Sequence, residues 1–157
     1  MHLSRLSTNP FLGALLFLLL PFVAYAQPSN DGCATPIALT VTTGSCASIQ
    51  YSNVGATTVG TDPLPPCWAP GTLSNTVWFS FVPTGPSVQI STNFANTLTN
   101  TQTAVFSGTC GALTLLACNE DINTGMGLLN TLLIVNNLTP GNTYLIMVDG
   151  NGAATGD

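Results

Sequence analysis

The spacing of short apolar runs is the feature that most limits the fold of this chain. After residue 36, runs rich in Val, Ile, Leu, Phe and Tyr recur about every ten residues, and Gly, Pro and Asn separate them. These runs lie at residues 37–41, 48–54, 77–82, 87–92, 103–108, 113–118, 129–138 and 143–150. None is a convincing helix. The pattern predicts an all-β fold, an antiparallel β-sandwich of about eight strands with jelly-roll or Greek-key connections.

One run predicts a central strand. In "NTVWFSFVP", Val77, Phe79 and Phe81 point to one side by the two-residue period, whereas Trp78 and Val82 point to the other. A strand with large apolar residues on both faces is usually covered on both. The preceding residues, 55–75, contain "TDPLPPCWAPG", whose prolines predict a loop.

The two ends of the chain predict export and a longer polypeptide. Residues 1–26 hold a basic start at Arg5, an apolar run and Ala24-Tyr25-Ala26, which is typical of a secretory signal peptide. The apolar run is too short to span a membrane. Residues 27–157 then form a single β-sandwich domain. Because "VDGNGAATGD" is a turn segment with no strand after it, we expect the closing strand and further domains to follow residue 157.

The charge of residues 27–157 excludes many functions. This segment has no Lys, Arg or His, and it carries all of the acidic residues, namely Asp31, Asp62, Glu120, Asp121, Asp149 and Asp157. Nucleic acids and anionic lipids need basic partners, so neither is expected. Ser-His-Asp and Cys-His catalysis lack their base, and zinc lacks its usual ligands. Carboxylate chemistry and oxygen ligation of calcium remain.

Acidic residues cluster after Cys118. Asn119, Glu120 and Asp121, joined by Asp149 or Asp62 from other loops, could supply oxygen ligands to calcium, the one cofactor that the sequence suggests. A solvated turn, in which Asn and Asp bind nearby amides, explains the same residues. A third reading pairs Glu120 with a distant Asp as the two carboxylates of a glycosidase. The spacing leaves these readings open.

Trp68 is a candidate ligand contact. It lies in the proline-rich loop, where an exposed ring could stack on a sugar or on another protein. The alternative is a ring that packs over the base of the loop beside Cys67.

Three stretches resemble a known family. "VWFSF" at 77–81, "AVFSGTCGALTLLACNED" at 104–121 and "LTPGNTYLIMVDG" at 138–150 are similar to extracellular β-sandwich modules of secreted, multidomain Bacteroidota-type proteins. These modules are related to bacterial pre-peptidase C-terminal domains, some of which bind calcium. The resemblance covers about residues 30–157. It implies a non-catalytic module that closes with a Gly-x-Phe-x-x-Cys strand, which is absent here.

Export makes disulfides the expected state of the cysteines, and their number, five, is odd. Cys110 and Cys118 are expected to pair across a hairpin, and Cys46 with Cys67. Cys33 is then left for the strand that the resemblance implies. A second scheme pairs Cys33 with Cys46 and leaves Cys67 free.

These observations predict a secreted or cell-surface module that is not itself an enzyme. Its expected role is structural, adhesive or ligand-binding, with an extracellular polysaccharide or protein as partner. The alternative is an accessory domain of a secreted protease or glycosidase whose catalytic part lies beyond residue 157.

Overall fold

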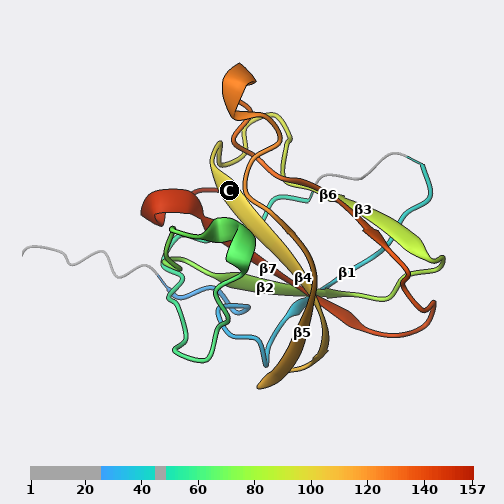
Figure 1. Ribbon diagram of the computed structural model, residues 1–157. Helices are drawn as coiled ribbons and strands as arrows, with labels where there is room; N and C mark the ends of the chain where they lie inside the picture. The colour runs from blue at the N-terminus through green and yellow to red at the C-terminus, as the bar shows by residue number, and fades with distance from the viewer. Residues whose placement is uncertain (1–25, 45–48) are drawn as a thin grey trace, which may run out of the picture.

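The computed structural model describes residues 26–44 and 49–157, which fold into seven strands and three short 3-10 helices (Figure 1). The strands form two sheets, and no helix in these residues is longer than three residues. The all-β prediction is confirmed. The predicted signal peptide, residues 1–26, lies almost entirely outside the described residues. Within the described ranges, no helix has the length and apolar character of a membrane span.

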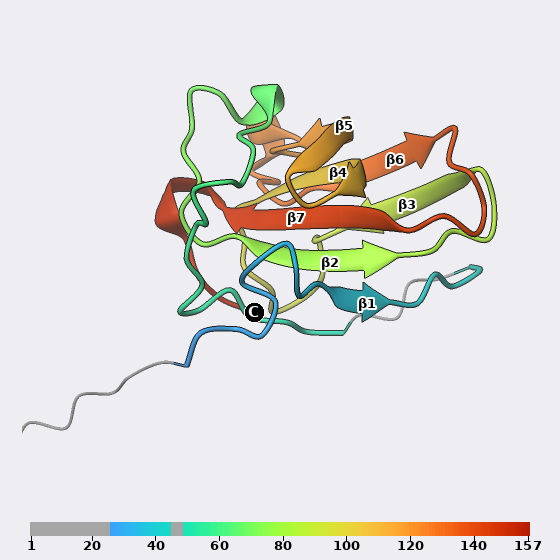
Figure 2. The same ribbon diagram turned by 90° about the horizontal axis from the view of Figure 1, so that it is seen from below.

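The larger sheet has five strands in the order β1-β2-β7-β4-β5 (Figure 2). Their bounds are β1 Ile37–Leu39, β2 Val77–Phe81, β4 Thr101–Thr109, β5 Ala112–Asn119 and β7 Tyr144–Gly150. All neighbours pair antiparallel except β1 and β2, which are parallel, so the sheet is mixed where a purely antiparallel one was predicted. β2 lies between β1 and β7, as its apolar faces predict.

The smaller sheet has only two strands. β3, Ser87–Ser91, pairs antiparallel with β6, Leu132–Asn136. In β6, buried Leu133 and Val135 alternate with exposed Leu132 and Ile134, which is the pattern of a strand with one solvated face.

The strand expected at residues 48–54 does not form over its described part. Residues 49–54 have no strand partner, although Tyr51 packs its ring on Phe79 with the centroids 5.1 Å apart. The Asn53 N–H donates instead to the carbonyl of Gly156, 3.1 Å away. Bonds of Ser52 and Asn53 to Ala154 and Gly156, most of them through side chains, stand in place of the ladder that a strand would need.

A main core lies between the two sheets. Its side chains come from β2, β4 and β7 on one side and from β3 and β6 on the other. Its buried members are Ala56, Val77, Phe79, Phe81, Val105, Leu133, Val135, Leu138, Tyr144 and Ile146. Burial of this apolar surface is the main force that holds the sheets together.

A second core covers the opposite face of the larger sheet. Trp68, from the 3-10 helix Pro66–Trp68, packs on this face. The strand side chains that it contacts alternate along each strand with those that belong to the main core. The other buried members of the second core are Trp78, Ala104, Phe106, Leu145 and Met147. A loop therefore serves as the cover of this face.

Two disulfides hold that covering layer. Cys33 is bonded to Cys110 and Cys67 to Cys118, with Cα atoms 5.8 and 6.2 Å apart. The three predicted pairs, Cys110 with Cys118, Cys46 with Cys67 and the alternative Cys33 with Cys46, are therefore wrong. Cys46 lies outside the described residues.

The register of the β4–β5 hairpin explains the main error. Cys110 lies in the turn between the strands, whereas Cys118 lies near the far end of β5, opposite Ala104. The two cysteines are thus separated by nearly the whole strand and cannot meet.

Candidate functional site

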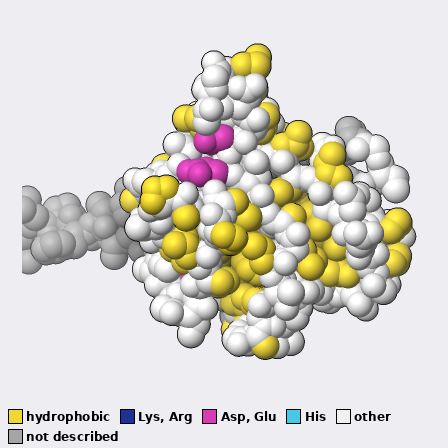
Figure 3. Space-filling view, viewed as in Figure 1, with side chains coloured by type: hydrophobic (Ala, Val, Ile, Leu, Met, Phe, Trp, Pro, Cys, Tyr) yellow, Lys and Arg dark blue, Asp and Glu magenta, His cyan; other side chains and the backbone are white. Residues whose placement is uncertain are grey.

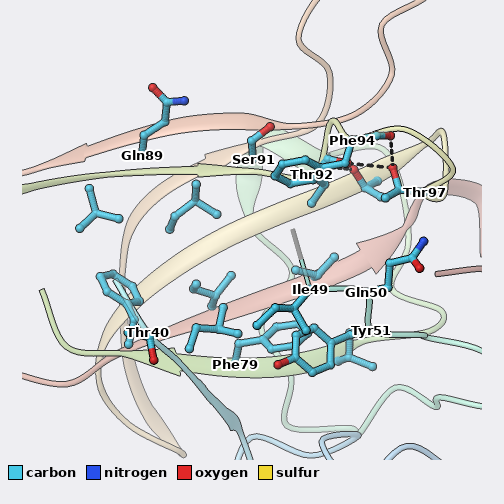
Figure 4. A pocket seen from close by; sticks show the side chains of 18 of the residues that line it. Thr40, Ile49, Gln50, Tyr51, Phe79, Gln89, Ser91, Thr92, Phe94 and Thr97 are labelled. Carbon is cyan, nitrogen blue, oxygen red and sulfur yellow. Dashed lines mark hydrogen bonds between the residues drawn. The ribbon is translucent and has the colours of Figure 1, made fainter. Parts of the chain in front are cut away.

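A groove of about 550 Å³ lies between the two sheets (Figure 4). One wall belongs to β1, β2 and β7, and the other to β3. The groove exists because two strands cannot cover a sheet of five. Its volume lies within the range of small-molecule and cofactor sites.

The wall of the larger sheet is apolar. Phe79 and Phe81 of β2 and Ile146 of β7 line it, and Tyr51 stands beside Phe79 (Figure 4). Val148 and Leu39, which also line it, are only partly buried. These are core-type residues that remain accessible from the groove.

The wall made by β3 consists of side chains and main chain together. All five residues from Ser87 to Ser91 line the groove. Gln89 and Ser91 point their side chains away from it (Figure 4). Their main-chain atoms must therefore line it, and Val88 and Ile90 supply the partly buried side chains.

One end of the groove is built by hydrogen bonds between loops. The Thr97 hydroxyl donates to the carbonyls of Thr92 and Phe94, at 3.1 and 2.8 Å (Figure 4). The Leu98 N–H donates to the carbonyl of Asp157, at 2.5 Å. Gly156 and Asp157 are part of the lining at this end.

Buried threonines fasten the smaller sheet to the larger beside this end. The Thr131 hydroxyl lies 2.7 Å from that of Thr103 on β4 and 3.0 Å from that of Thr92. The Thr92 hydroxyl also contacts that of Thr101, at 2.5 Å. These hydroxyl bonds set the distance between the sheets and so the width of the groove.

The groove carries almost no charge. Asp157 is the one acidic residue in its lining, and residues 27–157 contain no Lys, Arg or His. The acidic side chains in view in Figure 3 form one small patch, and no basic side chain is visible on that face. A ligand of the groove is therefore expected to be apolar and uncharged along the part that enters it.

The residues predicted for calcium do not assemble into one cage. Within residues 26–44 and 49–157, no group of three or more His, Cys, Asp and Glu side chains is placed to hold a metal ion. The side-chain oxygen of Asn119 accepts from the Leu132 N–H, at 3.3 Å. Glu120 accepts from the amides of Asn151 and Gln102, at 2.5 and 3.5 Å. Protein donors thus occupy the side-chain oxygen of Asn119 and one carboxylate oxygen of Glu120, whereas the buried Oδ1 of Asp121 has no hydrogen-bond partner among the described residues.

Asp149 lies apart from the turn and has a structural role. It is fully buried at the end of β7, and its carboxylate accepts from the N–H groups of Ser74 and Asn75. Burial raises the pKa of Asp149, while the bonds from these N–H groups oppose that rise. The carboxylate ties the proline-rich loop to the sheet.

The pair of carboxylates that a glycosidase needs does not line the groove. That chemistry needs two carboxylates across one cleft, whereas the groove lining contains Asp157 alone. Glu120 is not part of the lining.

Trp68 is not available to a ligand. Its side chain is 0% exposed, and its indole N–H donates to the carbonyl of Asn119 at 3.2 Å. The alternative interpretation, a ring packed over the base of the loop, is the one found.

Sequence reasoning missed the groove residues as a site. The alternation of residues 87–92 identifies Val88 and Ile90 as inward-facing, and 77–82 does the same for Phe79. Nothing in either pattern says that the space between them stays open.

Comparison of the chain with family models, with curated proteins and with solved structures gave no match. The resemblance to extracellular bacterial modules therefore stays a prediction.

Proposed function

We propose that this chain is a non-catalytic binding module of an exported protein and that its ligand occupies the groove between the sheets. The observation that carries the proposal is the groove that Phe79 and Val88 help to line, an open apolar space that a fold stabilised by burial would otherwise fill. Two disulfides support an oxidising, extracellular setting.

The chemistry of the lining favours binding over catalysis. It offers no His, Lys or Cys as a base or nucleophile, and Asp157 stands without a second carboxylate. An anionic ligand would find no basic partner there. Contact with a polymer at the cell surface, through an uncharged segment, is the role that these features support.

Binding of the neutral fluorescent dye Nile red tests the proposal. We expect the chain to bind the dye and the variant Val88→Asp to bind it about tenfold or more weakly, because a carboxylate in an apolar site is costly to desolvate. Ile134→Asp is the matched control, since Ile134 lies on the same sheet with 61% of its side chain exposed. Circular dichroism of all three proteins checks the fold.

Equal dye binding by Val88→Asp and Ile134→Asp, with both folded, would place the dye elsewhere and contradict the proposal. Absence of dye binding by the unmodified chain would contradict it as well.

A further inference from the structure

We infer that the ligand of the groove is a segment of another polypeptide, which adds to the free edge of β3 as an extended strand. The inference rests on the proposed function, because it names the occupant of the same groove. It concerns the main chain of β3 as much as the apolar walls.

The first support is the unpaired edge. β3 pairs with β6 on one side, and no strand within residues 26–44 and 49–157 pairs with its other side. Main-chain N–H and C=O groups of a strand alternate between its two sides, so about half of those of β3 face the groove. Gln89 and Ser91, whose side chains point away, contribute such main-chain atoms to the lining (Figure 4).

The second support is the lack of edge protection. Exposed edge strands usually carry Lys, Pro, a bulge or an inward-pointing charge that prevents pairing with other chains. β3 reads Ser-Val-Gln-Ile-Ser, and its pairing with β6 is regular over all five residues. Nothing in this strand opposes the addition of a neighbour.

The third support is the shape of the apolar wall. Phe79, Phe81 and Ile146 face the space that a strand beside β3 would occupy. Successive side chains of a strand point to opposite faces, so apolar residues at every second position would fill this space. The intervening positions would face solvent, as Gln89 does.

The fourth support is hydrogen-bonded main chain in the wall at one end of the groove. The carbonyl of Gly156 accepts from the Asn53 N–H at 3.1 Å, and its N–H donates to the Asn53 side chain at 2.8 Å. With the bond between Leu98 and Asp157, this end of the groove is built to hold peptide groups. An uncharged polypeptide segment needs no basic partner, and residues 27–157 offer none. A fatty acid, in contrast, would leave its carboxylate unpaired.

The experiment uses the whole chain and three synthetic seven-residue peptides. The first alternates Thr with Val or Phe. The second has the same side chains, but the main-chain nitrogens on one edge are methylated, and a third peptide is methylated on the other edge. We expect the unmethylated peptide to displace Nile red, and one methylated peptide to bind about tenfold or more weakly, because two or three main-chain hydrogen bonds are lost.

Amide hydrogen exchange of the chain shows where the peptide strand is added. Binding of the unmethylated peptide is expected to slow the exchange of β3 amides more than that of β5 amides. Val88→Asp is expected to abolish displacement and Ile134→Asp to preserve it.

The outcomes separate the two proposals. If Nile red binds but no peptide displaces it, or if all three peptides bind equally, strand addition is wrong while the groove remains a binding site. If dye and peptides both fail to bind, the proposed function is wrong too. If the unliganded chain forms a dimer at micromolar concentration with β3 amides protected, the occupant is a second copy and the inference is overturned.

Discussion

Cys67 and Cys118 lie 51 residues apart in the sequence and are joined in the fold, with their Cα atoms 6.2 Å apart. The bond ties the proline-rich loop to β5, beside the ring of Trp68. Together with the bond between Cys33 and Cys110, it holds a layer without strands over the second face of the larger sheet. Two covalent links thus hold this cover, which contains no strand that could join a hydrogen-bonded ladder.

Removal of one disulfide is expected to destabilise the fold markedly. For Cys33→Ser with Cys110→Ser, we expect a loss of about 2–5 kcal/mol in the free energy of unfolding, because the unfolded chain regains the freedom of a long loop. Urea denaturation measures the loss. Peptic fragments at acid pH check the connectivity, and a peptide pair linking Cys110 with Cys118 would contradict it.

Truncation of Trp68 tests whether its ring belongs to the core. Trp68→Ala is expected to cost about 3–5 kcal/mol in the free energy of unfolding, since the ring is fully buried. Trp68→Phe keeps most of the apolar surface and loses the bond to Asn119, so its cost should be smaller. Met126→Ala, at a side chain 73% exposed, is the control. A cost for Trp68→Ala no greater than that control would show that the ring does not support the core.

Thr131 links the two sheets through its hydroxyl. Thr131→Val keeps the shape but leaves Thr103 with one partner fewer, so we expect a loss of about 1–3 kcal/mol in the free energy of unfolding. Thr131→Ser retains the hydroxyl and should lose less. Thr114→Val, on the exposed side of β5, should change stability by less than about 0.5 kcal/mol. Equal losses for the Val and Ser variants at position 131 would refute the role of the hydroxyl.

The raised pKa of the Asp149 carboxyl makes the stability of the fold depend on pH. Burial raises its pKa in the folded state above the ordinary value of 3.8. Between these two pKa values, the folded state binds more protons than the unfolded state. The contribution of Asp149 to the free energy of unfolding is therefore fully present below pH 3.8 and is lost as pH rises through the raised pKa.

Denaturation of the unmodified chain and of Asp149→Asn over a pH series measures this contribution. The other carboxylates are common to both proteins, so the difference between the two free energies isolates residue 149. We expect the stability of the unmodified chain, relative to the variant, to fall as pH rises from about 4. A difference that rises with pH, or stays constant, would contradict the raised pKa.

Local patterns in the sequence were sufficient for seven of the eight expected strands. The alternation in 87–92 and the two apolar faces of 77–82 follow from the two-residue period of side chains along one strand, so both were predictable. Residues 48–54 show where this reasoning fails. Their pattern is also strand-like, but no neighbouring strand was placed to pair with Asn53, and such a neighbour is a property of the whole fold.

The sequence by itself determined the all-β class and the absence of basic chemistry after residue 26. The tertiary structure alone decided the disulfide partners, the burial of Trp68 and Asp149, and the opening between Phe79 and Val88. Each of these depends on which strands become neighbours and how many join each sheet. Periodicity within a strand does not encode those choices, because they follow from the packing of segments that are far apart in the chain.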